Sequence, residues 1–238
     1  MIVRRRNASL LLITQPDHAA LSARIMEQWT ADGLPQSPRR QEILLAVREH
    51  DNGWRDVDAA PIVDAASGRL LDFINAPDAV RQAVWPRGTG HLAATPYAAA
   101  LVAQHALHIY SHYRERPAWS DFFAATEKER DRHLSGAAPL ALEQLLRDYA
   151  FVRLGDLISL SFCTGGAIKN TDHAGYAVRL DGARVTVTPD PFGGREVPLE
   201  IAAYEMPDQH FSSADQALAA FRTARVVTLT GLACGAPI

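Results

Sequence analysis

The chain has 238 residues, which is enough for one large domain with a sizeable hydrophobic core. Its hydrophobic content of 47% and charged content of 21% are those of a globular protein, which argues against a disordered or fibrous one. A formal net charge of −3 argues against a general attraction to nucleic acid or to an anionic membrane surface. No apolar run approaches the ~20 residues of a membrane span, and the two cysteines form no zinc motif, so we expect a cytoplasmic protein with reduced thiols.

The first fifty residues predict a β-hairpin followed by two helices. Residues 2–5 and 9–14 look like two short strands on either side of a short turn. Residues 15–32 and 39–50 carry apolar side chains at helical spacing, with a proline-containing loop between them. Because the connection is short, we expect these two helices to pack antiparallel.

The middle of the chain predicts a loop and then a series of helices. Residues 55–78 lack helical periodicity and are rich in turn-forming residues, which indicates an ordered surface loop. The helix expected at residues 139–162 has a broad apolar surface, so we expect it to lie centrally. The helices are expected at residues 78–85, 96–113, 119–134 and 139–162, with a break at residues 86–88.

The C-terminal third changes to β-type patterning. Strands are expected at residues 176–180, 184–188, 197–204 and 225–229, with a hairpin turn at Asp181-Gly182. We therefore predict a single domain over residues 1–238 with a mainly α, HD-domain-like helical bundle. The helical core would span about residues 15–165. Terminal β elements at about 1–14 and 174–230 would form a small antiparallel sheet, making the whole α+β.

His50 and Asp51 form a candidate metal-binding pair at the end of the second helix. Neutral imidazole and carboxylate both bind first-row divalent ions, and a helix end holds the two side chains side by side. The alternative is that His-Asp is a common dipeptide placed before an Asn-Gly turn. His18 lies in the first turn of the preceding helix, so antiparallel packing would bring it to the same end of the pair.

Asp156 is the second carboxylate candidate, because it lies within the most apolar helix of the chain. An unpaired carboxylate in such a helix would cost several kcal/mol or would become protonated. Metal ligation would relieve this cost, and so would an arginine partner or an exposed position. Local sequence leaves these three alternatives open.

In chain order, His18, His50-Asp51 and Asp156 resemble the ligand set of the HD superfamily of metal-dependent phosphohydrolases. The resemblance implies an all-helical core that binds a divalent cation through one His, an adjacent His-Asp pair and a distant Asp. It covers about residues 15–165 and leaves the terminal strands unexplained. The sequence around these residues also resembles a bacterial family known only as a domain of unknown function. The shared features lie at residues 13–18, 50–54, 72–73 and 156–160.

His105 and His108 bear on the number of metal ions. Some members of the HD superfamily hold a second ion with two further histidines between the His-Asp pair and the final Asp. His105 lies in that interval on a helix, and His108 follows one turn later on the same face. His112 is also on this face by rough spacing, and the alternative is that one of the three is a buried, hydrogen-bonded histidine and the others face solvent.

The resemblance implies one or two divalent ions, of Mn, Fe, Ni, Zn or Mg, that lower the pKa of a bound water and polarise a phosphoryl oxygen. We expect Asp51 and His50 to be catalytic, and the metal ligands to be His18, His50, Asp51, His105 and Asp156. The expected activity is hydrolysis of a phosphomonoester or phosphodiester in a small molecule. Candidate substrate contacts are Arg48, Trp54, Arg55, Asp58, His108 and Lys169.

Two other functions fit the same residues. A di-iron oxygenase of the HD type would need both extra histidines, whereas in a non-catalytic metal-binding or structural module the histidines would be relics. We expect a small-molecule partner, no nucleic acid and no membrane. The oligomeric state stays open, with a homodimer as one option. The acidic loop at residues 56–72 counts against a nucleoside triphosphate substrate.

Overall fold

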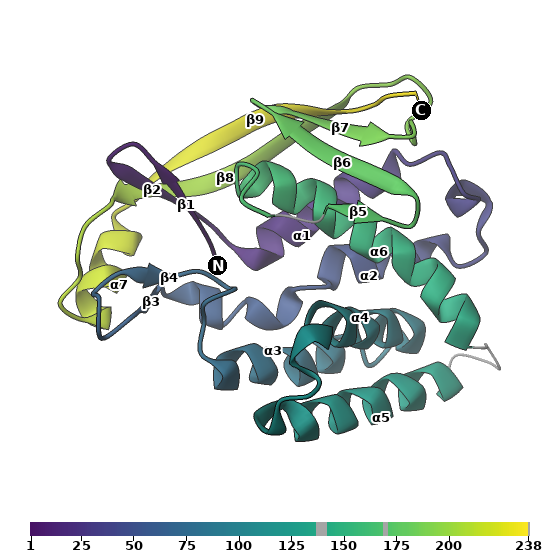
Figure 1. Cartoon of the computed structure of the whole chain (residues 1–238), viewed down its shortest axis with the longest axis horizontal. Helices are drawn as coiled ribbons and strands as arrows, with labels where there is room; N and C mark the ends of the chain where they lie inside the picture. The colour runs from purple at the N-terminus through teal and green to yellow at the C-terminus, as the bar shows by residue number, and fades with distance from the viewer. Residues whose placement is uncertain (137–141, 169–170, 238) are drawn as a thin grey trace.

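A computed structural model of the chain describes residues 1–136, 142–168 and 171–237. Figure 1 shows a curled sheet lying over α1 and α6, with α3, α4 and α5 on the far side of the helical body. The helices are α1 (Gln15–Glu27), α2 (Arg40–Glu49), α3 (Asp78–His91), α4 (Pro96–Ile109), α5 (Ser120–Gly136), α6 (Leu142–Cys163) and α7 (Ala214–Arg222). The strands are β1 (Ile2–Arg6), β2 (Ser9–Ile13), β3 (Ile62–Val63), β4 (Leu70–Leu71), β5 (Asp172–His173), β6 (Tyr176–Asp181), β7 (Arg184–Thr188), β8 (Val197–Pro207) and β9 (Arg225–Gly235).

The sheet corrects the predicted fold class. It has seven strands in the order β1-β2-β8-β9-β7-β6-β5 and is mixed, because β7 and β9 pair in parallel while the other neighbours are antiparallel. A mainly α bundle with a small antiparallel sheet is therefore wrong, and the fold is α+β with a large sheet. The expectation underestimated the sheet because β8 and β9 each run for 11 residues. Pairing between segments far apart in sequence also leaves no local signal.

The sheet buries one face against the helices. Along β8, the buried side chains of Val197, Leu199, Ile201 and Ala203 alternate with more exposed ones, as expected for a strand that covers a core on one side. These side chains belong to the same hydrophobic core as residues of α1 and α6. The helical body is thus attached to the sheet by a continuous apolar contact.

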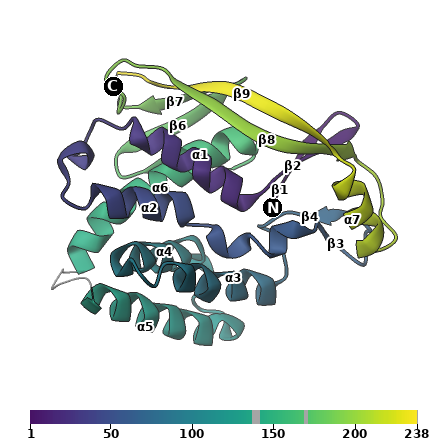
Figure 2. The ribbon, with the colours of Figure 1, turned by 180° about the vertical axis from the view of Figure 1, so that it is seen from behind.

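Strand β2 is buried on both faces. Leu11 and Ile13 face the main core, while Leu10 and Leu12 belong to a second, smaller core under α7 and the β3–β4 hairpin. Figure 2 shows α7 and this hairpin at the same end of the molecule as β1 and β2. Helix α7 was not predicted, and the β3–β4 hairpin lies in the segment that was predicted as a loop.

Helix α1 starts directly where β2 ends. Thr14 has an extended backbone, its side chain accepts a hydrogen bond from the backbone N–H of Asp17, and Pro16 lies in the first turn. These are the features of a helix N-terminus, because they satisfy a free N–H or remove one. The sheet therefore fixes the position from which α1 extends, and His18 lies one turn into that helix.

Helices α1, α2 and α6 meet at Gly155. A Cβ atom at this position would lie 2.8 Å from Met26 Cγ of α1 and 3.0 Å from Val47 Cγ1 of α2. A Cβ contact of 2.8 Å essentially never occurs and one of 3.0 Å is unusually tight, so a side chain here would force Met26 or Val47 to shift, and the close approach of the three helices favours glycine. The next residue along α6 is Asp156.

Several boundaries differ from the predicted ones. Helix α3 continues through Pro86 to His91, where a break was expected, and α4 ends at Ile109 with a short 3-10 turn after it. Within the described residues, no helix has both the length and the apolar character needed to cross a membrane.

Candidate metal centre

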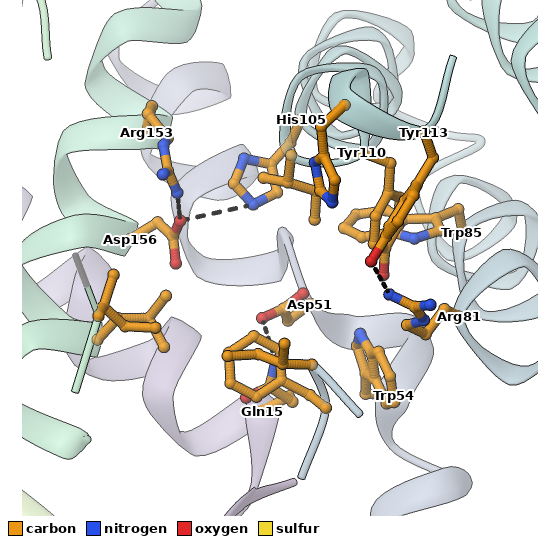
Figure 3. A pocket seen from close by; sticks show the side chains of 16 residues that line it. Gln15, Asp51, Trp54, Arg81, Trp85, His105, Tyr110, Tyr113, Arg153 and Asp156 are labelled. Atoms are coloured by element: carbon orange, nitrogen blue, oxygen red, sulfur yellow. Dashed lines mark hydrogen bonds and ion pairs between the residues drawn. The ribbon is translucent and has the colours of Figure 1, made fainter. Parts of the chain in front are cut away.

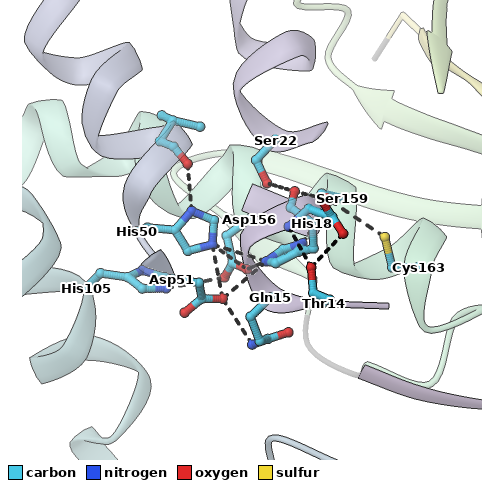
Figure 4. Close-up of polar contacts among 12 residues, drawn as sticks. Thr14, Gln15, His18, Ser22, His50, Asp51, His105, Asp156, Ser159 and Cys163 are labelled. Atoms are coloured by element: carbon cyan, nitrogen blue, oxygen red, sulfur yellow. Dashed lines mark hydrogen bonds and ion pairs between the residues drawn. The ribbon is translucent and has the colours of Figure 1, made fainter. Parts of the chain in front are cut away.

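Four of the predicted ligands lie together inside the helical body, and we call His18, His50, Asp51 and Asp156 the tetrad. His18 comes from the start of α1, His50 caps the end of α2, Asp51 follows it, and Asp156 comes from α6 (Figure 4). None of the four is more than 6% exposed. Two histidines and two carboxylates buried in one place need a common explanation, because isolated buried charges are strongly disfavoured.

The polar atoms of the tetrad lie at short and similar separations. The Nε2 atoms of His18 and His50 are 3.1 Å apart. Asp51 Oδ2 lies 3.5 Å from each of these nitrogens. Asp156 Oδ1 lies 3.3 Å from His18 Nε2 and 3.6 Å from His50 Nε2.

Hydrogen bonds at the far side of each ring assign its tautomer. His50 Nδ1 is 2.7 Å from the carbonyl oxygen of Val47, which can only accept, so Nδ1 carries the hydrogen. His18 Nδ1 is 2.8 Å from Ser159 Oγ, whose own hydrogen is donated to the carbonyl of His18. His18 Nδ1 therefore donates as well, and the neutral rings direct their Nε2 lone pairs into the tetrad.

The tetrad stabilises positive charge at its centre. Burial works against a charged imidazole, but hydrogen bonds to Asp156 and Asp51 hold the pKa of His18 well above its usual value. Burial also works against a charged carboxylate, yet hydrogen bonds to His18 and His50 keep the pKa of Asp156 well below its usual value. A proton or a cation placed among these atoms would thus be held by both carboxylates.

The donor set and its distances fit a divalent metal ion. For bonds of roughly 2.1 Å and angles between tetrahedral and octahedral, neighbouring ligand atoms lie about 3.0–3.4 Å apart. The separations of 3.1–3.6 Å within the tetrad lie close to this range. Two groups of buried donors could hold a metal ion whose identity is unknown: His18, His50 and Asp51 form the first, and His50, His105 and Asp156 form the second. The mixture of nitrogen and carboxylate oxygen suits Mn, Fe, Ni or Zn better than Mg.

His105 lies at the edge of the tetrad, on α4. Its ring centroid is 5.0 Å from that of His50, and its Nε2 is 3.8 Å from Asp156 Oδ2. Burial lowers the pKa of His105 to about 3, so the ring is neutral near pH 7 and its nitrogen can act as a ligand. His50, His105 and Asp156 form a second group that could hold an ion, and this group shares two residues with the tetrad.

A cavity of about 200 Å³ reaches the tetrad from one side only (Figure 3). Asp51, Asp156 and His105 line it, whereas His18 and His50 do not. The rest of the cavity surface is mostly aromatic and aliphatic. It includes Trp54, which was expected as a candidate substrate contact. The imidazole side of the tetrad is therefore closed by protein, and the carboxylate side is open.

Two further residues of this cavity were not singled out in the sequence. Gln15 donates a hydrogen bond from Nε2 to Asp51 Oδ2 at 3.0 Å, and its buried Oε1 has no partner among the described residues. Arg153 binds Asp156 Oδ2 through Nη1. Arg153 is one helical turn before Asp156, so the i,i+3 spacing was the available signal for the arginine partner left open above. Asp156 therefore has the arginine partner on Oδ2, while its Oδ1 lies beside the Nε2 atoms of His18 and His50.

The remaining candidates lie outside the cavity. Arg48 pairs with Glu27 on the surface, and Arg55 is exposed. Asp58 is buried, but it accepts hydrogen bonds from the amino group of Met1 and the backbone N–H of Gln15. The ring of His108 packs against Tyr149 and His173. Lys169 lies outside the described residues.

Comparison with known families adds a classification. A family model described as "Protein of unknown function (DUF3891)" matches residues 1–208. The chain belongs to this family. The DUF3891 match covers the tetrad, His105, Gln15 and Arg153, and it ends before α7 and β9. No curated protein and no solved structure matches the chain. The family assignment supports the resemblance to a family of unknown function and carries no activity with it.

Proposed function

We propose that this protein is an HD-like, metal-dependent phosphohydrolase that acts on a small phosphorylated molecule. The observation that carries the proposal is the one-sided opening of the tetrad, since Asp51 and Asp156 line a cavity while His18 and His50 are closed off. Metal sites that only stabilise a fold are enclosed by protein ligands, whereas catalytic sites keep a position open for water or substrate.

Under this proposal the tetrad holds one divalent ion. When bound, such an ion supplies Lewis acidity, which makes water more acidic and a phosphoryl group more electrophilic. Ser159 and the Val47 carbonyl fix the two imidazoles in the tautomers that ligation needs. His50 therefore acts as a ligand, because it does not reach the cavity from which substrate would enter.

Asp51 is the residue we assign to receive the proton of the attacking water. Burial raises its pKa, but the neighbouring His50 and His18 outweigh this and hold the pKa below the usual range, so Asp51 is ionised near pH 7. Gln15 fixes one oxygen of Asp51 and offers its unpaired Oε1 to a hydroxyl in the cavity. Among the described residues Arg153 uses Nη1 alone to bind Asp156, so its other N–H groups can meet a phosphate.

A di-iron oxygenase is the second candidate, because His105 completes a second possible metal group with His50 and Asp156. Two observations count against it. Arg153 already binds the Asp156 oxygen nearest His105. His108, the second histidine that a dinuclear site would need, packs away from the cavity.

The test is to purify the protein without chelator, count metal ions per chain by elemental analysis, and assay phosphomonoester and phosphodiester hydrolysis with added Mn, Fe, Ni, Zn or Mg. We expect close to one ion per chain and metal-dependent release of phosphate. The variant His50→Ala should lose both, and His91→Ala, which replaces an exposed histidine of α3, should keep both. Close to two irons per chain with no hydrolysis would favour the oxygenase, and full metal content in His50→Ala would overturn the site.

A further inference from the structure

We propose that the substrate carries, next to its phosphate, one small apolar group of about the size of an aromatic ring, and that the site excludes nucleotides. This inference rests on the proposed phosphohydrolase function, because it assumes that the phosphate meets the tetrad. It concerns the opposite end of the same cavity, which the tetrad does not determine.

The cavity has two chemically different ends. One end carries Asp51, Asp156 and Arg153. With a divalent ion bound, the positive charge of the ion and of Arg153 exceeds the negative charge of the two carboxylates, so this end favours an anionic group. The other end is formed by four aromatic side chains, which we call the aromatic wall. The aromatic wall consists of Trp54, Trp85, Tyr110 and Tyr113.

Arg81 holds the aromatic wall in place, and its buried Nε has no hydrogen-bond partner among the described residues. Its Nη1 donates to Tyr113 Oη at 3.0 Å, and its guanidinium lies over the rings of Tyr113 and Tyr110, at 4.9 Å and 5.8 Å from their centroids. Its charge is balanced by an ion pair with Asp78. A wall fixed in this way is preorganised, so a flat apolar group can bind without first ordering the side chains.

The size of the cavity limits what can occupy it. A cavity of 150 Å³ is known to hold one benzene ring, and sites for drug-sized ligands span roughly 300–1,000 Å³. At about 200 Å³, this cavity has space for one ring and a phosphate beside the tetrad. A nucleotide adds a ribose and a bicyclic base, which exceeds that space.

The mouth of the cavity is partly apolar, and the exposed His112 also lines it. Ile74 lines the cavity and is 47% exposed, and the partly buried Phe73 lies next to it. A large aliphatic side chain exposed beside an opening would lose water contact when an apolar ligand enters, which favours binding. A sugar or nucleotide, whose surface is rich in hydroxyls, would gain nothing from this contact.

The test uses non-hydrolysable phosphonates with the metal-loaded full-length chain. Phenylphosphonate, methylphosphonate and the phosphonate analogue of adenosine 5′-monophosphate are titrated by calorimetry, and quenching of tryptophan fluorescence gives a second measurement, because Trp54 and Trp85 line the cavity. We expect phenylphosphonate to bind roughly tenfold or more tightly than methylphosphonate, from burial of the ring. The phosphonate analogue of adenosine 5′-monophosphate should bind more weakly than phenylphosphonate.

Two matched variants place the effect at the cavity mouth. Ile74→Ser should reduce the affinity for phenylphosphonate by roughly threefold to tenfold and leave methylphosphonate unchanged. Val226→Ser, which replaces an aliphatic side chain on β9 that is 59% exposed, should change neither.

The outcomes separate this inference from the function on which it rests. Equal affinity for the two phosphonates, or faster hydrolysis of a nucleotide or sugar phosphate than of phenyl phosphate, would overturn the inference and leave the phosphohydrolase in place. Preferential binding of phenylphosphonate with no hydrolysis of any phosphoester would overturn the phosphohydrolase and support the predicted shape and polarity of the cavity.

Discussion

The Nε2 atoms of His18 and His50 lie 3.1 Å apart, although each neutral ring keeps its hydrogen on the opposite nitrogen. Two lone pairs at this distance repel each other, and the two carboxylates beside them add further negative charge. The arrangement becomes favourable when a cation or a proton lies between the rings. This relationship makes the protein sensitive to metal and to pH in ways that can be measured.

Removing the metal should lower the thermal stability of the protein. An ion present at a hundred times its dissociation constant stabilises the folded state by about 2.7 kcal/mol, which corresponds to a rise in Tm of roughly 5–10 °C for a chain of this size. Scanning calorimetry with chelator and with added Mn, Ni or Fe measures the difference. His91→Ala should show the same rise, and His50→Ala should show none. A Tm that ignores every ion would contradict the metal site.

Ser159→Ala should weaken metal binding without removing a ligand. Ser159 Oγ accepts the Nδ1 hydrogen of His18, and loss of such an orienting contact lowers metal affinity by about 10- to 100-fold. Metal titration in competition with a chromogenic chelator measures the change.

Ser161→Ala is the matched control for Ser159→Ala. Ser161 lies on the same helix and is buried to a similar degree, but its hydroxyl binds the Leu157 carbonyl and not a tetrad residue. Unchanged affinity is expected in this control. Equal losses in the two variants would mean that any buried serine of α6 matters, and that orientation of His18 is not the cause.

Gly155→Ala should separate the helices that carry the tetrad. The added methyl group would lie 2.8 Å from Met26 and 3.0 Å from Val47, and overpacking of this kind costs about 1–3 kcal/mol. We expect a lower free energy of unfolding in chemical denaturation and a weaker metal affinity.

The matched control for Gly155→Ala is Gly90→Ala in α3, where a Cβ atom would meet nothing within 4 Å. Alanine in an open helical position favours the helix, so this variant should be neutral or more stable by about 0.5–1 kcal/mol. If Gly155→Ala were equally harmless, α1, α2 and α6 would not be as closely packed as the structure has them.

Metal-free protein should be most stable in mildly acidic solution. Burial disfavours the charged ring of His18, but Asp156 and Asp51 raise its pKa well above 6.5, so its contribution is complete below pH 6.5 and is lost as the pH rises through the raised value. Burial likewise disfavours ionised Asp156, but His18 and His50 lower its pKa well below 3.8. The contribution of Asp156 is complete above pH 3.8 and is lost as the pH falls through the lowered value.

Burial lowers the pKa of His105 to about 3, so its contribution is lost as the pH falls below 6.5, and melting temperatures recorded in chelator should be highest near pH 6.5. With saturating metal the trend should reverse above pH 6, because the ion displaces the proton and its affinity rises with pH. A metal-free Tm that climbed steadily from pH 5 to pH 8 would show that His18 does not hold a proton between the carboxylates.

The tetrad could be predicted from the sequence because its residues lie close to recognisable helix starts and helix ends. His18 follows a cap and a proline, and His50-Asp51 ends a periodic helix. Arg48 shows the limit of such reasoning. It is two positions before His50, which is about 200° around a helix, and the structure places it on the outer surface with Glu27. A position close to His50 in the sequence therefore did not show which face of the helix the Arg48 side chain occupies.

The size of the sheet and the aromatic wall could not be predicted from the sequence, because both depend on contacts between segments that are distant in the chain. Strand β2 pairs with β8, almost two hundred residues later, and nothing in either run of residues specifies the other. Trp85 and Tyr113 meet at the cavity through α3 and the turn after α4, which were expected as separate helices without a stated packing. Side chains that line one cavity from several elements have no common pattern in the sequence.

The position of β9 has a consequence for association between molecules. Within the described residues, the half-sheet β1-β2-β8 and the half-sheet β7-β6-β5 are joined by β9 alone, and β9 lies beyond the region that the family model matches. If β9 were released, β8 and β7 would each expose an unpaired edge, and such edges recruit strands from other chains. The strand that completes this sheet is therefore also the one that keeps the protein from aggregating through it.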